Sequence, residues 1–75
     1  MRASNYVYLD VQVIRQETPK AFQVVTYEGR LEWIPKSQVR DPEDFEAGDC
    51  DLTLEITDWI AKEKGLVARE PGEEG

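Results

Sequence analysis

The sequence contains no histidine and only one cysteine, Cys50. Without histidine the chain can form neither a Ser-His-Asp triad nor a Cys-His pair, and it has no imidazole to bind a metal. A single cysteine also excludes an internal disulfide and a cysteine-rich zinc site. Because Cys50 lies between Asp49 and Asp51, two carboxylates disfavour its reactive thiolate form. We therefore expect a protein that is not an enzyme and that has no cofactor and no metal site.

Long hydrophobic runs are also missing. The apolar runs are only a few residues long, whereas a transmembrane helix needs about 20 such residues. The first residues lack the apolar core of a secretory signal. We therefore expect a cytoplasmic protein that makes no contact with a membrane. The 75 residues suffice for one small domain, whose core is marginal and leaves little room for a deep pocket.

The charge is acidic and unevenly distributed. Nine basic and 16 acidic side chains give a net charge of −7. Residues 1–40 hold six basic and four acidic side chains, a sum of +2, whereas residues 41–75 hold three basic and twelve acidic ones, a sum of −9. The sequence thus combines a mildly basic first part with a strongly acidic second part.

Hydrophobic residues that alternate with polar ones predict strands. Residues 6–16 alternate, with Val7, Leu9, Val11 and Val13 on the core face. In this pattern Ile14 lies on the opposite face. Residues 51–56 alternate in the same way and direct three side chains inward: Leu52, Leu54 and Ile56.

Residues 21–28 and 31–35 are expected to form a β-hairpin. With Glu28-Gly29 as the central turn residues, the turn is a tight two-residue one. Val24 then lies opposite Trp33, and one hairpin face carries the apolar residues Phe22, Val24, Leu31 and Trp33. This register favours Trp33 as a core residue. The alternative is that Trp33 stacks on a nucleic-acid base or on a proline of a peptide.

Two helical segments are expected after the hairpin. Asp41 precedes Pro42 and two further acids, a pattern typical of an N-cap, a first helical residue and an acidic first turn. This short turn is expected to extend to Ala47. A second helix is expected to begin after Thr57 or Asp58 and to end at Lys64, with Gly65 as its stop signal.

The predicted order is three strands, a polar connector, a fourth strand and a helix. This order favours a β-rich α+β fold, a small SH3-like and partly open antiparallel barrel of about four strands with a C-terminal helix. An OB-like barrel is the alternative. We assign residues 1–67 to this single domain and residues 68–75 to a disordered acidic tail.

Part of the chain resembles a short hairpin module of uncharacterised phage and mobile-element proteins. In that module a T-x-K-A strand leads through a glycine turn into W-I-P-K-S-Q. The matching residues are Thr18, Lys20, Ala21, Gly29, Trp33, Ile34, Pro35, Lys36, Ser37 and Gln38. The stretch over residues 58–66, DWIAKEKGL, is similar to the closing helix of such proteins. The resemblance covers about half of the chain and implies a small β-rich fold and a phage or prophage origin, but no activity.

Two groups of polar residues are candidates for binding a protein. Six acids lie within residues 41–51 with no base between them, and they lack the spacing of a calcium loop. They form either a solvated loop or an electrostatic surface for a basic partner. Polar residues after the hairpin are expected to lie exposed beside it. The candidate residues are Asp41, Glu43, Asp44, Glu46, Asp49, Lys36, Ser37 and Gln38.

Our leading hypothesis is a small acidic, non-enzymatic protein-interaction module, in the role of a phage or mobile-element accessory or inhibitor protein that binds a basic partner. The alternative is a single-stranded nucleic-acid-binding protein, in which bases stack on the aromatic and basic face of the sheet. The residues that would carry the alternative are Tyr6, Tyr8, Tyr27, Arg30, Trp33 and Lys36. The net charge of +2 in residues 1–40 gives only a weak attraction to a nucleic acid, which carries one negative charge per nucleotide. The alternative therefore ranks second.

Overall fold

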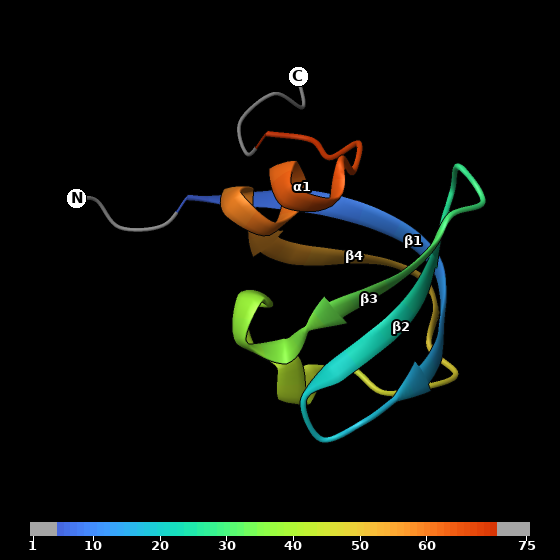
Figure 1. Cartoon of the computed structure of the whole chain (residues 1–75). Helices are drawn as coiled ribbons and strands as arrows, with labels where there is room; N and C mark the ends of the chain where they lie inside the picture. The colour runs from blue at the N-terminus through green and yellow to red at the C-terminus, as the bar shows by residue number, and fades with distance from the viewer. Residues whose placement is uncertain (1–4, 71–75) are drawn as a thin grey trace.

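The computed structural model describes residues 5–70, which form one four-stranded antiparallel sheet and one short helix (Figure 1). The strands are β1 (Tyr6–Glu17), β2 (Ala21–Thr26), β3 (Leu31–Pro35) and β4 (Cys50–Thr57). Two 3-10 turns, η1 (Lys36–Gln38) and η2 (Pro42–Asp44), lie between β3 and β4, and helix α1 (Asp58–Lys64) follows β4. The strand order is β3-β2-β1-β4. The predicted β-rich α+β class, with four antiparallel strands and a C-terminal helix, is confirmed.

Strand β1 is the long central strand, and it has a different neighbour at each end. Its first part pairs with β4, from Tyr6 opposite Thr57 to Val13 opposite Cys50. Its second part pairs with β2 and ends at Glu17. The sheet curls around this strand (Figure 1). Beyond η1, an isolated antiparallel bridge joins Val39 to Ile56 of β4.

A bulge in β1 changes which side chains face the core. Val11 lies opposite Thr26 but Val13 lies opposite Val25, so Gln12 is an extra residue on the β1 side. A bulge of this kind shifts the alternation of side chains by one position. Ile14 is therefore fully buried, whereas Val13 is only half-buried. The prediction that Val13 faces the core and Ile14 the opposite face was wrong, because strict alternation takes no account of an inserted residue.

The turn between β2 and β3 has three residues and not two. The N–H of Thr26 donates to the carbonyl of Arg30 over 2.9 Å, and the N–H of Gly29 donates to the carbonyl of Thr26 over 2.9 Å. Tyr27, Glu28 and Gly29 thus connect the strands, with Gly29 at φ 84°. Such a backbone angle, which glycine adopts without strain, is what a three-residue hairpin loop requires at this position.

This turn moves the hairpin register by one residue. Gln23, and not Val24, lies opposite Trp33. Consequently Ile34 is fully buried, whereas Leu31 and Trp33 lie on the outer face with 49% and 40% of their surface exposed. The prediction that Leu31 and Trp33 belong to the core face was wrong.

The hydrophobic core lies inside the curled sheet and is completed by α1. Its buried residues are Val7, Leu9, Val11, Ile14, Phe22, Val24, Ile34, Val39, Leu54, Ile56, Ile60 and Ala61. The hydroxyl of Thr57 accepts a hydrogen bond from the Ile60 N–H, and Gly65 ends the helix at φ 64°. Both helix boundaries are as predicted. No helix within residues 5–70 has the length and apolar character needed to cross a bilayer.

After α1 the chain returns along β1. Arg69 and Tyr8 exchange two backbone hydrogen bonds of 2.7 Å each, and the Arg69 guanidinium forms a bidentate ion pair with Asp10. The sequence analysis assigned residues 68–75 to a disordered tail, whereas the structure places Arg69 in this antiparallel bridge. Residues 71–75 of that predicted tail lie outside the described residues.

The bulge can be tested with a matched pair of threonine substitutions. We expect Ile14→Thr to lower the free energy of unfolding by about 2–3 kcal/mol, because it removes apolar contacts and buries a hydroxyl without a prepared partner. Val13→Thr should cost less than about 1 kcal/mol, because this side chain is only half-buried. Urea unfolding of both variants checks this. Equal losses, or a larger loss for Val13→Thr, would contradict the bulged register.

Candidate functional site

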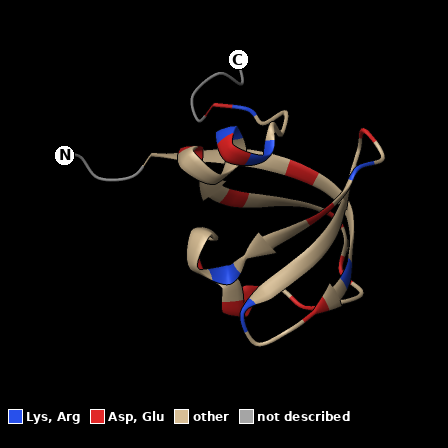
Figure 2. Cartoon of the chain, in the orientation of Figure 1, with Lys and Arg blue, Asp and Glu red and all other residues tan. Residues whose placement is uncertain are grey.

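The acidic segment, which we define as residues 41–51, follows η1 and contains η2 and the first two residues of β4. Figure 2 shows its acidic residues along the part of the chain between η1 and β4. Four carboxylates are exposed and Asp49 is half-buried; the exposed ones belong to Asp41, Glu43, Asp44 and Glu46. No ion pair involves these five carboxylates within residues 5–70. They therefore present uncompensated negative charge to the solvent.

Asp41 occupies the predicted position before η2, but its side chain makes no capping hydrogen bond. Its backbone is left-handed, with φ 49° and ψ 55°, a conformation that aspartate tolerates better than most residues. The turn ends at Asp44, so the expected extension to Ala47 was wrong.

Backbone hydrogen bonds attach the end of the acidic segment to β1. The N–H of Gly48 donates to the carbonyl of Ile14 over 2.8 Å, and the N–H of Ile14 donates to the carbonyl of Asp49 over 2.9 Å. The Asp49 carboxylate accepts the N–H of Glu46 over 3.0 Å. The segment is thus held against the sheet, and its charges have defined positions.

Lys36 and Gln38 have structural partners, and Ser37 between them is exposed. The Lys36 ammonium pairs with the Glu17 carboxylate at 2.6 Å and lies 4.9 Å from the centroid of the Phe22 ring. The Gln38 side-chain oxygen accepts the Thr57 hydroxyl over 2.6 Å. The expectation that these polar residues lie exposed beside the hairpin was therefore wrong for Lys36 and Gln38, because the curl of the sheet brings Glu17 and Thr57 beside them.

The residues of the nucleic-acid alternative lie on different strands. Tyr6 and Tyr8 lie on the part of β1 that pairs with β4, whereas Trp33 lies on the edge strand β3, which β2 separates from β1. Arginine side chains cover both β1 tyrosines: the Arg40 and Arg69 guanidinium carbons lie 5.6 and 5.5 Å from the ring centroids of Tyr6 and Tyr8.

The remaining members of that set are engaged elsewhere. The Tyr27 hydroxyl donates to Asp51 over 2.5 Å, and this hydrogen bond to a carboxylate raises the pKa of Tyr27. Arg30 pairs with Glu32 and donates to the carbonyls of Lys64 and Gly65 over 2.8 and 2.7 Å. Arg30 thus caps the C-terminal end of α1, where a cation is favourable.

Most basic side chains are neutralised within the molecule. Of the eight lysine and arginine residues in 5–70, five form ion pairs with carboxylates: Arg30, Lys36, Arg40, Lys62 and Arg69. Arg69 and Thr53 both donate to Asp10, which holds the pKa of that carboxyl below its ordinary value of 3.8. Each pair removes one charge of each sign, and the basic residues of 5–70 that form no ion pair are Arg15, Lys20 and Lys64.

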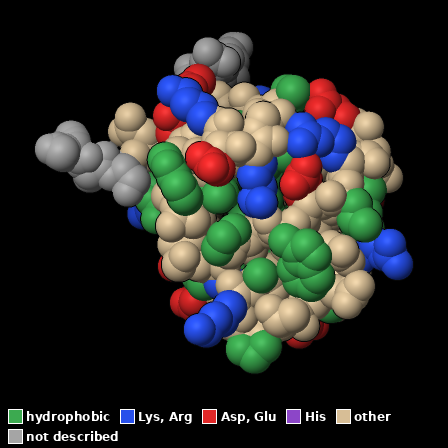
Figure 3. Space-filling view, in the orientation of Figure 1, with side chains coloured by type: hydrophobic (Ala, Val, Ile, Leu, Met, Phe, Trp, Pro, Cys, Tyr) green, Lys and Arg blue, Asp and Glu red, His purple; other side chains and the backbone are tan. Residues whose placement is uncertain are grey.

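The hairpin carries an exposed hydrophobic row that its sequence pattern did not predict. Leu31 and Trp33 project from the outer face of β3, and Val25 lies opposite Leu31 on β2. Figure 3 shows hydrophobic side chains gathered over this part of the molecule. The sequence signal that could have revealed the row is Gly29 as the third residue after Thr26. A three-residue loop that ends in glycine sets the register in which Ile34 points inward.

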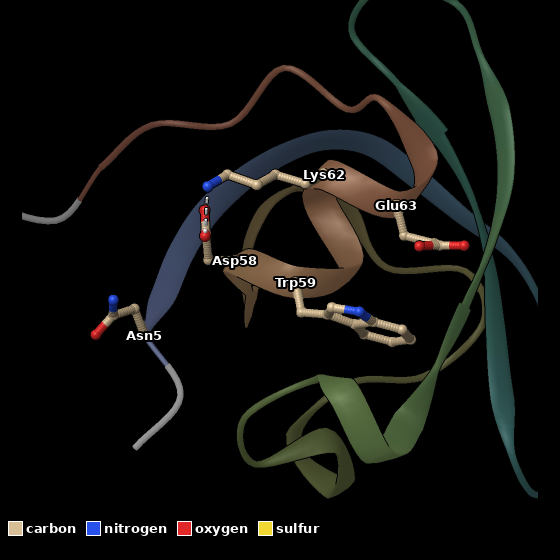
Figure 4. Close-up of a pocket in the computed structure, with 5 residues that line it drawn as sticks. All are labelled: Asn5, Asp58, Trp59, Lys62 and Glu63. Carbon is tan, nitrogen blue, oxygen red and sulfur yellow. Dashed lines mark ion pairs between the residues drawn. The ribbon is translucent and has the colours of Figure 1, made fainter. Parts of the chain in front are cut away.

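A shallow pocket of about 430 Å³ lies beside α1 (Figure 4). Its lining residues are Asn5, Asp58, Trp59, Lys62 and Glu63. Lys62 and Asp58 pair with each other at 3.1 Å, and Trp59 is 60% exposed. The lining offers an aromatic surface with charges around it and contains no serine, threonine or cysteine.

Within residues 5–70, no three Cys, Asp or Glu side chains are grouped so as to hold a metal ion. The sequence matches no protein-family model, and it matches neither a curated protein nor a solved structure. The geometry and charge of the described residues are therefore the basis for any functional proposal.

The Asp10 carboxylate predicts a specific pH dependence. Because its pKa is lower in the folded chain than the ordinary 3.8, its stabilising effect is present above that value and is lost as the pH falls through the folded pKa. At pH 7, Asp10→Asn should lower the free energy of unfolding by about 0.5–1 kcal/mol. Urea unfolding should show this difference from the wild type shrinking below about pH 4.

The matched control is Glu28→Gln. The Glu28 side chain is exposed and forms no ion pair within residues 5–70, so this change should have little effect at either pH. An effect of Asp10→Asn that is the same at pH 7 and pH 3 would refute the role assigned to the Asp10–Arg69 pair.

Proposed function

We propose that this chain is a non-enzymatic protein-interaction module that binds a basic surface of a partner protein through the acidic segment. The observation that carries the proposal is the contrast in ion pairing. The chain neutralises five of its own cations, while no ion pair within residues 5–70 involves a carboxylate of the acidic segment. A surface of this kind attracts and orients a partner of opposite charge.

The anchoring of the acidic segment supports the proposal. The hydrogen bonds between Ile14 and residues 48 and 49 hold the segment in place before a partner arrives. A preorganised surface loses less conformational entropy on binding than a mobile loop does. The left-handed residues Asp41 and Asp51, at φ 49° and 52°, mark the two ends of this ordered segment.

We further propose that the sheet is an SH3-like, partly open barrel and that the protein is an accessory or inhibitor protein of a phage or mobile element. The curl of β1 and the Val39–Ile56 bridge beyond η1 support the first statement, because they bring the connector that follows β3 against β4. The hairpin resemblance over residues 18–38 supports the second. In this role the chain occupies a basic surface of a host protein.

The proposal predicts binding that depends on salt and on the acidic segment. We expect Glu43→Gln, Asp44→Asn, Glu46→Gln and Asp49→Asn together to weaken binding about tenfold or more, because four steering and contact charges disappear. Raising the salt from 50 to 300 mM should weaken wild-type binding in the same direction. Calorimetric titration of the partner, first recovered by affinity capture and mass spectrometry, measures both effects.

The matched control changes the net charge by the same four units elsewhere. Glu28, Glu70, Glu73 and Glu74 lie outside the acidic segment, and their replacement by glutamine should weaken binding only a few-fold. Equal losses of affinity in the two fourfold variants would show that the overall charge, and not the acidic segment, causes the effect. A partner whose affinity is insensitive to both salt and the four substitutions would exclude the proposed mode of binding.

The nucleic-acid alternative makes an opposite prediction. Because Arg30, Lys36, Arg40 and Arg69 are paired with carboxylates, we expect oligothymidylate at 20 mM salt to leave the tryptophan fluorescence unchanged. Bases that stack on Trp33 or Trp59 would quench it. Quenching together with a gel shift at micromolar protein would favour the nucleic-acid function instead.

A further inference from the structure

The outer edge of β3 has unused backbone hydrogen-bonding groups. Strand β3 is the last strand of the sheet on its side. Lys36 donates its N–H to Lys20 over 2.7 Å, and Thr26 donates its N–H to Arg30 over 2.9 Å. In an antiparallel pair such hydrogen-bonded residues alternate with residues whose N–H and C=O point to the other side. Leu31 and Trp33 are therefore the β3 residues that direct these groups away from β2.

No hydrogen bond from the rest of residues 5–70 reaches these groups. Within this range the backbone N–H and C=O of Leu31 and Trp33 have no partner outside β3, and the side-chain hydrogen bonds in this region go instead to the backbones of residues 30, 64 and 65. An edge of this kind is a template for an additional strand. Pro35 lacks an N–H and ends the available edge.

The side chains of this edge differ between its two faces. Leu31 and Trp33 form a half-exposed apolar row on the outer face. Glu32 between them points to the other face, where its side chain is 19% exposed and its carboxylate contacts the Arg30 guanidinium at 2.5 Å. An added strand would therefore meet two apolar positions on one face and a carboxylate on the other.

Helix α1 adds further acidic and aromatic surface near this edge. Arg30, the residue before β3, hydrogen-bonds to the carbonyls of Lys64 and Gly65, so the end of α1 lies beside the start of β3. Glu63 and Trp59 project from the same side of α1 (Figure 4), and both are exposed. Lys62 and Lys64 lie on the same helix, so the preference for a positively charged segment with apolar residues comes from Glu32, from Glu63 and from the net charge of −7.

We propose that the edge of β3 binds an extended segment of the partner protein by β-strand addition, with a lysine or arginine opposite Glu32 and apolar residues opposite Leu31 and Trp33. The inference rests on the proposed protein-binding function and specifies how part of the partner is recognised. Main-chain hydrogen bonds supply affinity in this mode, and the alternating side chains supply specificity.

Charge complementarity selects a basic segment over a second copy of this chain. In the register that uses all four free backbone groups, a second copy would place its own Glu32 directly opposite Glu32. Like charges directly opposite each other destabilise a strand pair, and each chain carries a net charge of −7. A basic residue at the same position avoids this repulsion and shares the Glu32 carboxylate with Arg30.

The test uses the full chain and three synthetic peptides. The probe is acetyl-Ser-Val-Lys-Val-Ser-amide; in the second peptide glutamate replaces lysine, and in the third both valines are N-methylated. We expect the lysine peptide to shift the NMR amide signals of Leu31 and Trp33. The affinity of the glutamate peptide should be at least about fivefold lower than that of the lysine peptide. The N-methylated peptide should leave both amides unchanged, because it cannot supply the N–H donors.

A pair of glutamine variants tests the role of Glu32. Glu32→Gln should reduce the preference for the lysine peptide over the glutamate peptide, while Glu43→Gln, a substitution in the acidic segment, should leave that preference unchanged. Equal binding of the lysine and glutamate peptides, or shifts confined to residues 41–51, would overturn the proposal. Shifts of Leu31 and Trp33 that grow with protein concentration alone would show that a second copy occupies the edge, and would also overturn it.

Failure of this inference is distinguishable from failure of the proposed function. The four-acid variant of the acidic segment should bind the lysine peptide within about twofold of the wild type, because the peptide pairs with β3. If binding of the partner depends on the acidic segment but the lysine peptide does not shift the NMR amide signals of Leu31 and Trp33, only the edge proposal is refuted. A partner whose binding ignores the acidic segment would refute the proposed function, even if the peptide binds β3.

Discussion

Strand β1 pairs with β4 along its first part and with β2 along its second, and the extra residue at Gln12 lies where the two pairings meet. The Gln12 side chain donates to the carbonyl of Thr26 over 2.9 Å, so the bulge is tied to the neighbouring strand. Bulges bend a strand and increase its local twist. The bend lets one strand serve both halves of the curled sheet, and it turns Ile14 into the core. The buried cluster, the position of α1 and the attachment of the acidic segment all depend on this geometry.

The curl of the sheet also determines which charged side chains form ion pairs within the molecule. Glu17 at the end of β1 reaches Lys36 of η1, and Asp10 near its start reaches Arg69 after α1. These two pairs join segments that lie far apart in the sequence, and they neutralise two of the eight basic side chains in residues 5–70. The acidic segment runs from the residue before η2 to the second residue of β4, and its carboxylates form no ion pair within residues 5–70. Internal pairing and preorganisation together make this segment the best-supported surface for a basic partner.

One residue in a turn decides the character of the hairpin. A three-residue connection with Gly29 at positive φ directs Ile34 inward and leaves Leu31 and Trp33 outside. The same register leaves the backbone groups of these two residues directed away from β2. An apolar row and an unused strand edge therefore occur at the same place. Neither feature follows from the composition, because a slip of one residue exchanges the two faces of a strand.

The sequence by itself determined the number and type of elements, because local patterns govern them. Alternation predicted the four strands, the Thr57 cap and the Gly65 stop delimited α1, and the acidic character of residues 41–51 is a matter of composition. Tertiary structure alone decided the strand phase at Val13 and Ile14, the exposure of Trp33, and the partners of Lys36 and Gln38. Bulges, turn lengths and long-range ion pairs are set by how distant strands meet. For this chain, therefore, local chemistry specified the elements, and the curl of the sheet decided which of their side chains remain exposed and unpaired.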